Sequence, residues 1–129
     1  MVFNLKLVDR FHKAFGVYKE TPKKATLIEE KEYLLRYKLM DEENEEYLAA
    51  CKSDDLVEIA DALGDQLYVL CGTILKHGLH HKIDEVFDEI HESNMSKLDA
   101  KGNPILRKDG KVMKSNLYFR PNIKKILEQ

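Results

Sequence analysis

The 129-residue sequence contains no tryptophan, two cysteines, three prolines and six glycines. Two cysteines are too few for a disulfide framework, and the scarcity of glycine and proline favours helices over a turn-rich β architecture. No run approaches the roughly 18 apolar residues of a membrane span, and charged residues interrupt the amino terminus before a signal-peptide core could form. We therefore expect a cytoplasmic protein without a membrane partner.

An excess of charge of one sign is also lacking. The chain has 21 Lys and Arg against 23 Asp and Glu, which gives a net charge of −2. This near balance argues against a protein that coats nucleic acid, so we expect no nucleic-acid partner. With 43% hydrophobic and 34% charged residues, the chain has the composition of a folded globular protein. Its length predicts a single domain over residues 1–129.

Apolar residues at spacings of three and four predict four helices, over residues 3–15, about 26–51, about 54–77 and about 80–97. Thr26 and Glu29 have the spacing of a capping box at the start of the second helix. After Leu98 the pattern changes to two short strands joined at Asp109-Gly110, followed by a helical turn at 123–127. We therefore predict an all-α fold: a four-helix bundle over about 3–98, with a C-terminal β-hairpin and tail over about 99–129.

The second and third predicted helices carry acids where an apolar surface is expected. On the third helix the acids follow one strip at i, i+3 and i+7, and on the second they continue the apolar stripe. Because a short break joins the two helices, antiparallel pairing would bring up to six carboxylates to one small volume: Glu42, Glu43, Glu46, Glu58, Asp61 and Asp65. Buried carboxylates require compensation, and Mg²⁺ or Mn²⁺, which prefer oxygen ligands, would supply it.

Two plainer interpretations compete with a metal site. The run of acids over residues 41–46 has the composition of a solvated helix face, and Glu58 could instead complete a capping box with Asp55 as the N-cap residue. A strip of acids on an otherwise apolar helix is not typical of a solvated face, and it favours the metal site.

The spacing Glu43-x-x-Glu46, eleven residues, Glu58-x-x-Asp61 resembles the signature of the all-α nucleoside triphosphate pyrophosphohydrolases. This MazG-like superfamily includes phosphoribosyl-ATP pyrophosphohydrolases and dimeric dUTPases. The stretch 94–97, Asn-Met-Ser-Lys, resembles an Asn-x-Ser-Lys element of one branch, and the tail from Gly110 to Pro121 resembles the same branch. The resemblance covers roughly residues 5–121.

The resemblance implies hydrolysis between the α- and β-phosphates, which gives a monophosphate and pyrophosphate. It implies that Glu43, Glu46, Glu58 and Asp61 hold Mg²⁺, with Mn²⁺ as a substitute. Glu42 and Glu43 are the catalytic candidates, Glu42 because it would contact a metal ion or help to deprotonate the attacking water. The candidates for substrate contacts are Asn94, Lys97, Arg36, Lys111 and Lys114.

The leading interpretation is a Mg²⁺-dependent enzyme that acts on a nucleoside triphosphate, deoxynucleotides included, because the tail resembles the nucleotide-cleaning branch. One alternative is a phosphoribosyl-ATP pyrophosphohydrolase. Another is a non-catalytic helical module that binds a metal ion or a nucleotide. Helices with apolar character on several sides are hard to bury within one chain, so we also expect a homodimer or homotetramer.

Overall fold

The computed structural model describes residues 2–129. The contacts of the chain divide it into two compact units, one ending at His81 and the other running from Lys82 to Gln129, and we describe each by itself. The first unit contains α1 (Val2–Ala14), α2 (Glu30–Lys52), α3 (Leu56–Lys76) and the 3₁₀ turn η1 (Leu79–His81). The second contains α4 (Ile83–Met95), β1 (Ile105–Leu106), β2 (Val112–Met113) and α5 (Ile123–Leu127). The single domain over 1–129 stays a prediction.

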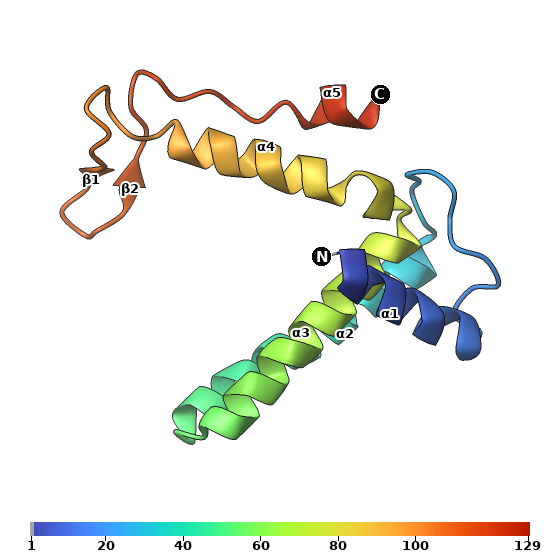
Figure 1. Ribbon diagram of the computed structural model, residues 1–129. Coiled ribbons are helices and arrows are strands. Elements are labelled where there is room, and N and C mark those ends of the chain that lie inside the picture. The colour runs from blue at the N-terminus through green and yellow to red at the C-terminus, as the bar shows by residue number, and fades with distance from the viewer. Residues whose placement is uncertain (1) are drawn as a thin grey trace. The chain divides into compact units, whose positions relative to one another are not determined.

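Helices α2 and α3 form an antiparallel hairpin and lie side by side along their length (Figure 1). The chain reverses at Asp54, whose φ of 52° is in the left-handed region that Asp tolerates better than most residues. Asp55 then begins α3, because its side chain accepts a hydrogen bond from the Glu58 amide at 3.2 Å. Two small buried residues, Ala50 and Ala62, let the helices approach closely near this turn.

The core of the first unit lies at the opposite end of the hairpin, where α1 packs on the C-terminal half of α3 (Figure 1). The buried apolar residues here are Leu5 and Val8 of α1 and Cys71, Ile74 and Leu75 of α3. They recur at helical spacing, which is why the sequence pattern predicted both helices. Packing against α1 therefore anchors one end of the hairpin, and the end near the Asp54 turn lies outside this core.

Two predicted helix starts are wrong. Thr26 does not form a capping box: its hydroxyl donates to the Leu27 carbonyl, and its amide donates to the His77 carbonyl at 2.8 Å. This tie to the end of α3 keeps the loop non-helical up to Glu29, which makes no side-chain cap. The fourth helix begins at Ile83 rather than about 80, because the 3₁₀ turn η1 occupies the residues before it. Gly78, which precedes η1, packs so closely on the preceding loop that a Cβ there would lie 2.1 Å from the Lys24 carbonyl oxygen.

The second unit confirms the predicted hairpin and the final helical turn. Strands β1 and β2 pair antiparallel, with Ile105 opposite Met113, and Gly110 in the connecting turn has a φ of 86° that favours glycine. The Ser93 hydroxyl of α4 donates to the Phe119 carbonyl at 2.8 Å and ties the tail to the helix. The all-α class with a small C-terminal β-hairpin is confirmed.

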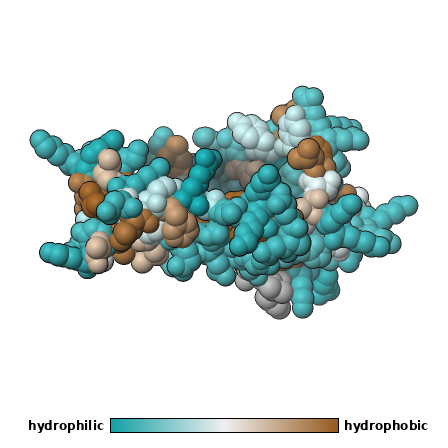
Figure 2. All heavy atoms as spheres, turned by 90° about the horizontal axis from the view of Figure 1, so that it is seen from above, coloured by the Kyte–Doolittle hydropathy of each residue, from teal (hydrophilic) through white to brown (hydrophobic). Residues whose placement is uncertain are grey.

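The surface agrees with the composition. None of the helices that the structure describes combines the length and the apolar character needed to cross a bilayer. Figure 2 shows one face on which hydrophilic side chains predominate and hydrophobic side chains form separate clusters.

Candidate active site

Three carboxylates meet between α2 and α3. Glu43 and Glu46 come from α2 and Asp65 from α3, and one oxygen of each lies within 4.8 Å of the others. Spacing of i and i+3 places the two glutamates on neighbouring positions of one helix face, and the antiparallel partner brings Asp65 opposite them. We call Glu43, Glu46 and Asp65 the acid cluster.

Glu43 is the most constrained member of the acid cluster. Burial raises the pKa of its carboxyl, and the hydrogen bond and charge of Glu46 raise this pKa further, followed by the charges of Asp65 and Glu42. Its Oε2 atom is shielded from solvent and has no hydrogen-bond partner among the residues described. A buried acceptor without a partner costs free energy, and so does the repulsion between carboxylates.

These properties fit a bound cation. Carboxylate oxygens are the ligands that Mg²⁺ and Mn²⁺ prefer, and a divalent ion would satisfy the shielded oxygen while offsetting the repulsion. The acid cluster can therefore hold a metal ion.

The other two predicted ligands face a cavity next to the acid cluster. This cavity, of about 280 Å³, is lined by Glu46, Glu58 and Asp61, and small residues such as Ala49 and Ala62 leave room between the helices. Glu58 does not complete a capping box with Asp55, because the Asp55 amide donates to the Ala50 carbonyl at 3.2 Å. The Glu58 carboxylate is therefore not required at the start of α3.

The structure thus arranges five of the six predicted acids in two overlapping groups. Glu46 belongs to both: it lies in the acid cluster, and it lines the cavity with Glu58 and Asp61. Asp65 was outside the predicted ligand set, although its place on the acid strip of α3 was the signal for it. Glu42 is exposed beside the cluster. The roles of these residues as metal ligands and catalytic groups stay predictions.

Arg36 occupies a different environment from the one expected of a substrate contact. It is 7% exposed, and its guanidinium donates to the Thr73 hydroxyl at 3.1 Å and to the Val69 carbonyl at 2.9 Å. These hydrogen bonds join α2 to α3 beyond the acid cluster. The role of Arg36 as a substrate contact stays a prediction.

The four remaining candidates for substrate contacts lie in the second unit. Asn94 is exposed near the end of α4, and its carbonyl accepts a hydrogen bond from the amide of the half-buried Lys97 at 3.2 Å. Lys111 is exposed in the hairpin, and the Lys114 ammonium lies 4.7 Å from the centroid of the Tyr118 ring. Their contacts with phosphate stay predictions.

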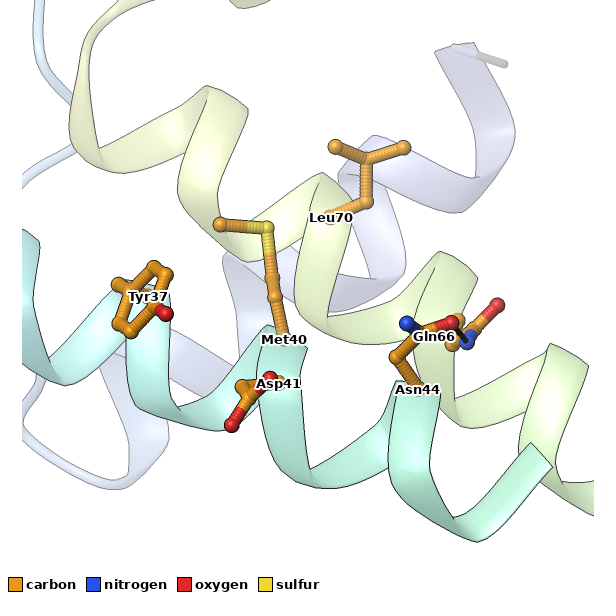
Figure 3. Close-up of a pocket in the computed structure, with 6 residues that line it drawn as sticks. All are labelled: Tyr37, Met40, Asp41, Asn44, Gln66 and Leu70. Atoms are coloured by element: carbon orange, nitrogen blue, oxygen red, sulfur yellow. Dashed lines mark hydrogen bonds between the residues drawn. The ribbon is translucent and has the colours of Figure 1, made fainter. Parts of the chain in front are cut away.

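A second cavity between α2 and α3 was not predicted. Figure 3 shows its lining, which comes from both helices, and the hydrogen bond of 3.1 Å that the Gln66 amide donates to Asn44. The cavity is about 370 Å³ in volume. Its residues are neighbours in sequence of Glu43 and Asp65, and nothing in their pattern distinguished them from exposed helix positions: Tyr37, Met40, Asp41, Asn44, Gln66 and Leu70.

A helical hairpin that gathers carboxylates between its helices, with the signature described above, defines an all-α nucleoside triphosphate pyrophosphohydrolase of the MazG-like superfamily. The family model described as phosphoribosyl-ATP pyrophosphohydrolase matches residues 8–94, well over half of the chain. The chain therefore belongs to the phosphoribosyl-ATP pyrophosphohydrolase family, and it is a pyrophosphohydrolase enzyme. No curated protein matches the chain.

Proposed function

We propose that the chain hydrolyses phosphoribosyl-ATP between its α- and β-phosphates and releases pyrophosphate. The observation that carries this proposal is the family match over residues 8–94, which spans both acid-bearing helices and most of α4. The sequence left phosphoribosyl-ATP as the alternative substrate, and the family match favours this substrate over a general nucleoside triphosphate.

We propose Mg²⁺ as the cofactor, with Mn²⁺ as a substitute. The acid cluster would hold it, and Glu58 and Asp61 would extend the ligand set from the neighbouring cavity. A bound Mg²⁺ neutralises phosphate charge and makes a water molecule a stronger acid. The shielded Oε2 of Glu43 and the oxygen-only donor set support this assignment.

The side chains around the acid cluster supply proton transfer and phosphate binding. We propose Glu42, which is exposed and whose charge acts on Glu43, as the group that accepts a proton from the attacking water. The raised pKa of Glu43 belongs to the chain without a metal ion, and as a metal ligand Glu43 would bind as the carboxylate. The cations of the predicted site would neutralise the leaving pyrophosphate, with Asn94 as an uncharged contact: Lys97, Arg36, Lys111 and Lys114.

The C-terminal region favours a second candidate function, hydrolysis of nucleoside triphosphates that include deoxynucleotides. The family match ends at Asn94, so the Asn-x-Ser-Lys element is only partly inside it, and the hairpin and tail lie outside it. These outlying residues are the ones that resemble the nucleotide-cleaning branch.

We also propose a homodimer or homotetramer. Apolar side chains remain exposed on both helices of the hairpin, for example Tyr37 at 62% on α2 and Val57 at 76% on α3. Exposed apolar groups of this kind are typical of interfaces between subunits. Sedimentation measurements over a range of concentrations test this proposal, and a chain that stays monomeric at all of them contradicts it.

The activity is tested by incubating the chain with Mg²⁺ and phosphoribosyl-ATP, and in parallel with the common NTPs and dNTPs, while pyrophosphate and orthophosphate are measured separately. We expect pyrophosphate release to be fastest with phosphoribosyl-ATP and to stop when EDTA is added. A preference for an NTP or dNTP would support the second candidate function. Metal binding without turnover of any member of the panel would contradict both.

A further inference from the structure

A third cavity lies between α1 and α3, entirely within the first unit. Its volume is about 160 Å³, close to that of the apolar cavities of roughly 150 Å³ that accept benzene, so it can take one ring of a purine while the other ring stays at its open side. The floor is apolar, and two polar side chains line the cavity, the Asn4 amide and the Tyr68 phenol. It is lined by Asn4, Leu7, Gly64, Leu67, Tyr68 and Cys71, together with the fully buried Val8.

The same strip of α3 carries both the acids and this cavity. Tyr68 follows Asp65 by three residues and Asp61 by seven, and at 100° per residue it points within about 20° of Asp61 around the helix axis. Along the axis, Asp61 and Tyr68 are separated by about 10 Å. A metal ion, the α-phosphate and the ribose would lie in series between the acids and the base and together can span this separation, so a nucleotide with its phosphates at the acids can reach the cavity with its base.

The walls of the cavity have the chemistry of a base-binding site. Tyr68 is 42% exposed, and Phe11 supports its ring edge-on, with centroids 5.7 Å apart and an interplanar angle of 87°. A half-exposed, supported aromatic ring offers a stacking face, which is worth about 1–3 kcal/mol per base in single-stranded nucleic-acid complexes. The Asn4 amide carries one donor and one acceptor, the pair that matches N6 and N7 of adenine.

Gly64 keeps the cavity open. A Cβ added at this position would have no heavy atom within 4 Å, so the space above Gly64 is vacant and belongs to the cavity. Asn4 and Leu7 lie outside the segment matched by the family model, which begins at residue 8. The part of the cavity that would read the base is therefore supplied by residues beyond the family match.

From this geometry we infer that the cavity between α1 and α3 is the nucleobase subsite of the enzyme, with adenine stacked on Tyr68 and its N6 and N7 edge at Asn4. The inference deepens the proposed function and rests on it for the direction in which the phosphates lie. Adenine binding in the cavity can be measured without turnover, so the two can fail separately.

The test is the affinity of the intact chain for AMP in the presence of Mg²⁺, measured by calorimetry, with ribose 5-phosphate as the control ligand that lacks a base. The blocking variant is Gly64→Leu, which fills the vacant space and replaces glycine with a better helix former, so folding is preserved. The matched control is Ala60→Leu, which adds a leucine side chain at an exposed position of the same helix outside the cavity. A second variant, Tyr68→Ala, removes the stacking face.

We expect AMP to bind the wild-type chain at least tenfold more tightly than ribose 5-phosphate and GMP. Gly64→Leu and Tyr68→Ala should each weaken AMP at least tenfold while Mg²⁺ affinity and ribose 5-phosphate binding stay unchanged, and Ala60→Leu should bind AMP as the wild type does. Wild-type AMP affinity in both Gly64→Leu and Tyr68→Ala overturns the inference, as does equal binding of AMP and ribose 5-phosphate to the wild type. Turnover of phosphoribosyl-ATP alongside either result leaves the proposed function standing, and base-dependent AMP binding without any turnover leaves only the subsite.

Discussion

The two ends of the α2–α3 hairpin differ in the surroundings of their charged side chains. At the end packed by α1, the guanidinium of the buried Arg36 donates to Thr73 and Val69, and the neighbouring buried His12 keeps its Nδ1 without a described partner. At the end near the Asp54 turn, carboxylates crowd together, and Glu43 keeps a shielded oxygen without a described partner. One end buries a hydrogen-bonded cation, whereas the other gathers carboxylates that repel one another.

Residues that stabilise the fold and residues that we propose for function therefore lie at opposite ends of one pair of helices. Changes at the packed end should alter the free energy of unfolding, while changes at the acid end should alter metal binding and turnover with little effect on folding. A carboxylate cluster held together against repulsion is a stability cost that only a bound cation offsets.

The largest effect is expected from Glu46→Gln, because Glu46 belongs to the acid cluster and also lines the cavity with Glu58 and Asp61. Glu46 would hold the metal ion that neutralises the reacting phosphates, and loss of one such electrostatic stabiliser should lower kcat by about 10²–10³-fold. The variant should melt no lower than the wild type without metal, since a repulsive charge has been removed. Steady-state kinetics and thermal unfolding measure the two effects.

The matched control for that change is Glu45→Gln, which removes an exposed acid of the same helix from outside the acid cluster. It should leave kcat within about twofold of the wild type, as expected for a surface group away from the site. Equal losses in the two variants would show that general negative charge, and not the acid cluster, supports turnover.

At the packed end, His12 should make folding sensitive to acid. Burial lowers its pKa to about 4, and the charges of Arg36 and Lys76 contribute, while Asp9 opposes them. Because the unfolded chain binds this proton near pH 6.5, unfolding takes up a proton between about pH 6.5 and 4, and stability falls as the pH drops through that range. The loss is on the order of 3 kcal/mol.

Urea unfolding at pH 7 and pH 4.5 measures this loss. His12→Gln, which cannot titrate, should show a smaller difference between the two pH values than the wild type. His91→Gln, which changes an exposed histidine of α4, should behave as the wild type does. An undiminished pH dependence in His12→Gln would assign the effect to other groups.

Helix positions and the acid strip could be predicted because both are periodic in the sequence. Leu5, Val8, Cys71 and Leu75 recur at helical spacing, and Asp65 lies on the same strip of α3 as Asp61. The division of the acids into two groups could not be read this way, because it depends on how far one helix slides along the other. That offset is set by contacts such as the one between Arg36 and Val69, which join residues distant in sequence.

Local signals failed where tertiary contacts replaced them. Thr26 and Glu29 have the spacing of a capping box, yet the Thr26 amide bonds to His77 at the far end of α3. Arg36 was predicted as a substrate contact from its charge, and that role stays a prediction, but its burial between α2 and α3 could not be read from the sequence. A sequence shows that a positively charged side chain is present, but only the packed structure shows which groups surround that side chain.

A smaller effect is expected from Gly72→Ala, where a new Cβ would lie 2.7 Å from Arg36 Nη2 and 2.9 Å from His12 Nε2. Both neighbours are buried, so the guanidinium must give up hydrogen bonds to move, and we expect a loss of about 2 kcal/mol. Gly64→Ala in the same helix meets no atom within 4 Å and should instead gain up to about 1 kcal/mol. Opposite signs in chemical unfolding distinguish crowding from helix propensity, and a stabilised Gly72→Ala would mean that the packed end is looser than the structure shows.

The smallest effect is expected from Mg²⁺ on the melting temperature. An ion that binds only the folded chain should stabilise it by about 1.4 kcal/mol at tenfold excess over its dissociation constant, or about 5 °C for a chain of 129 residues. The shift should vanish in Glu43→Gln, which loses the carboxylate with the shielded oxygen, and persist in Glu45→Gln. Equal shifts in both variants would place the ion elsewhere. Neither substitution lies at the packed end. The difference between the two variants in their Mg²⁺-induced shift of the melting temperature therefore measures how much a bound cation stabilises the acid end.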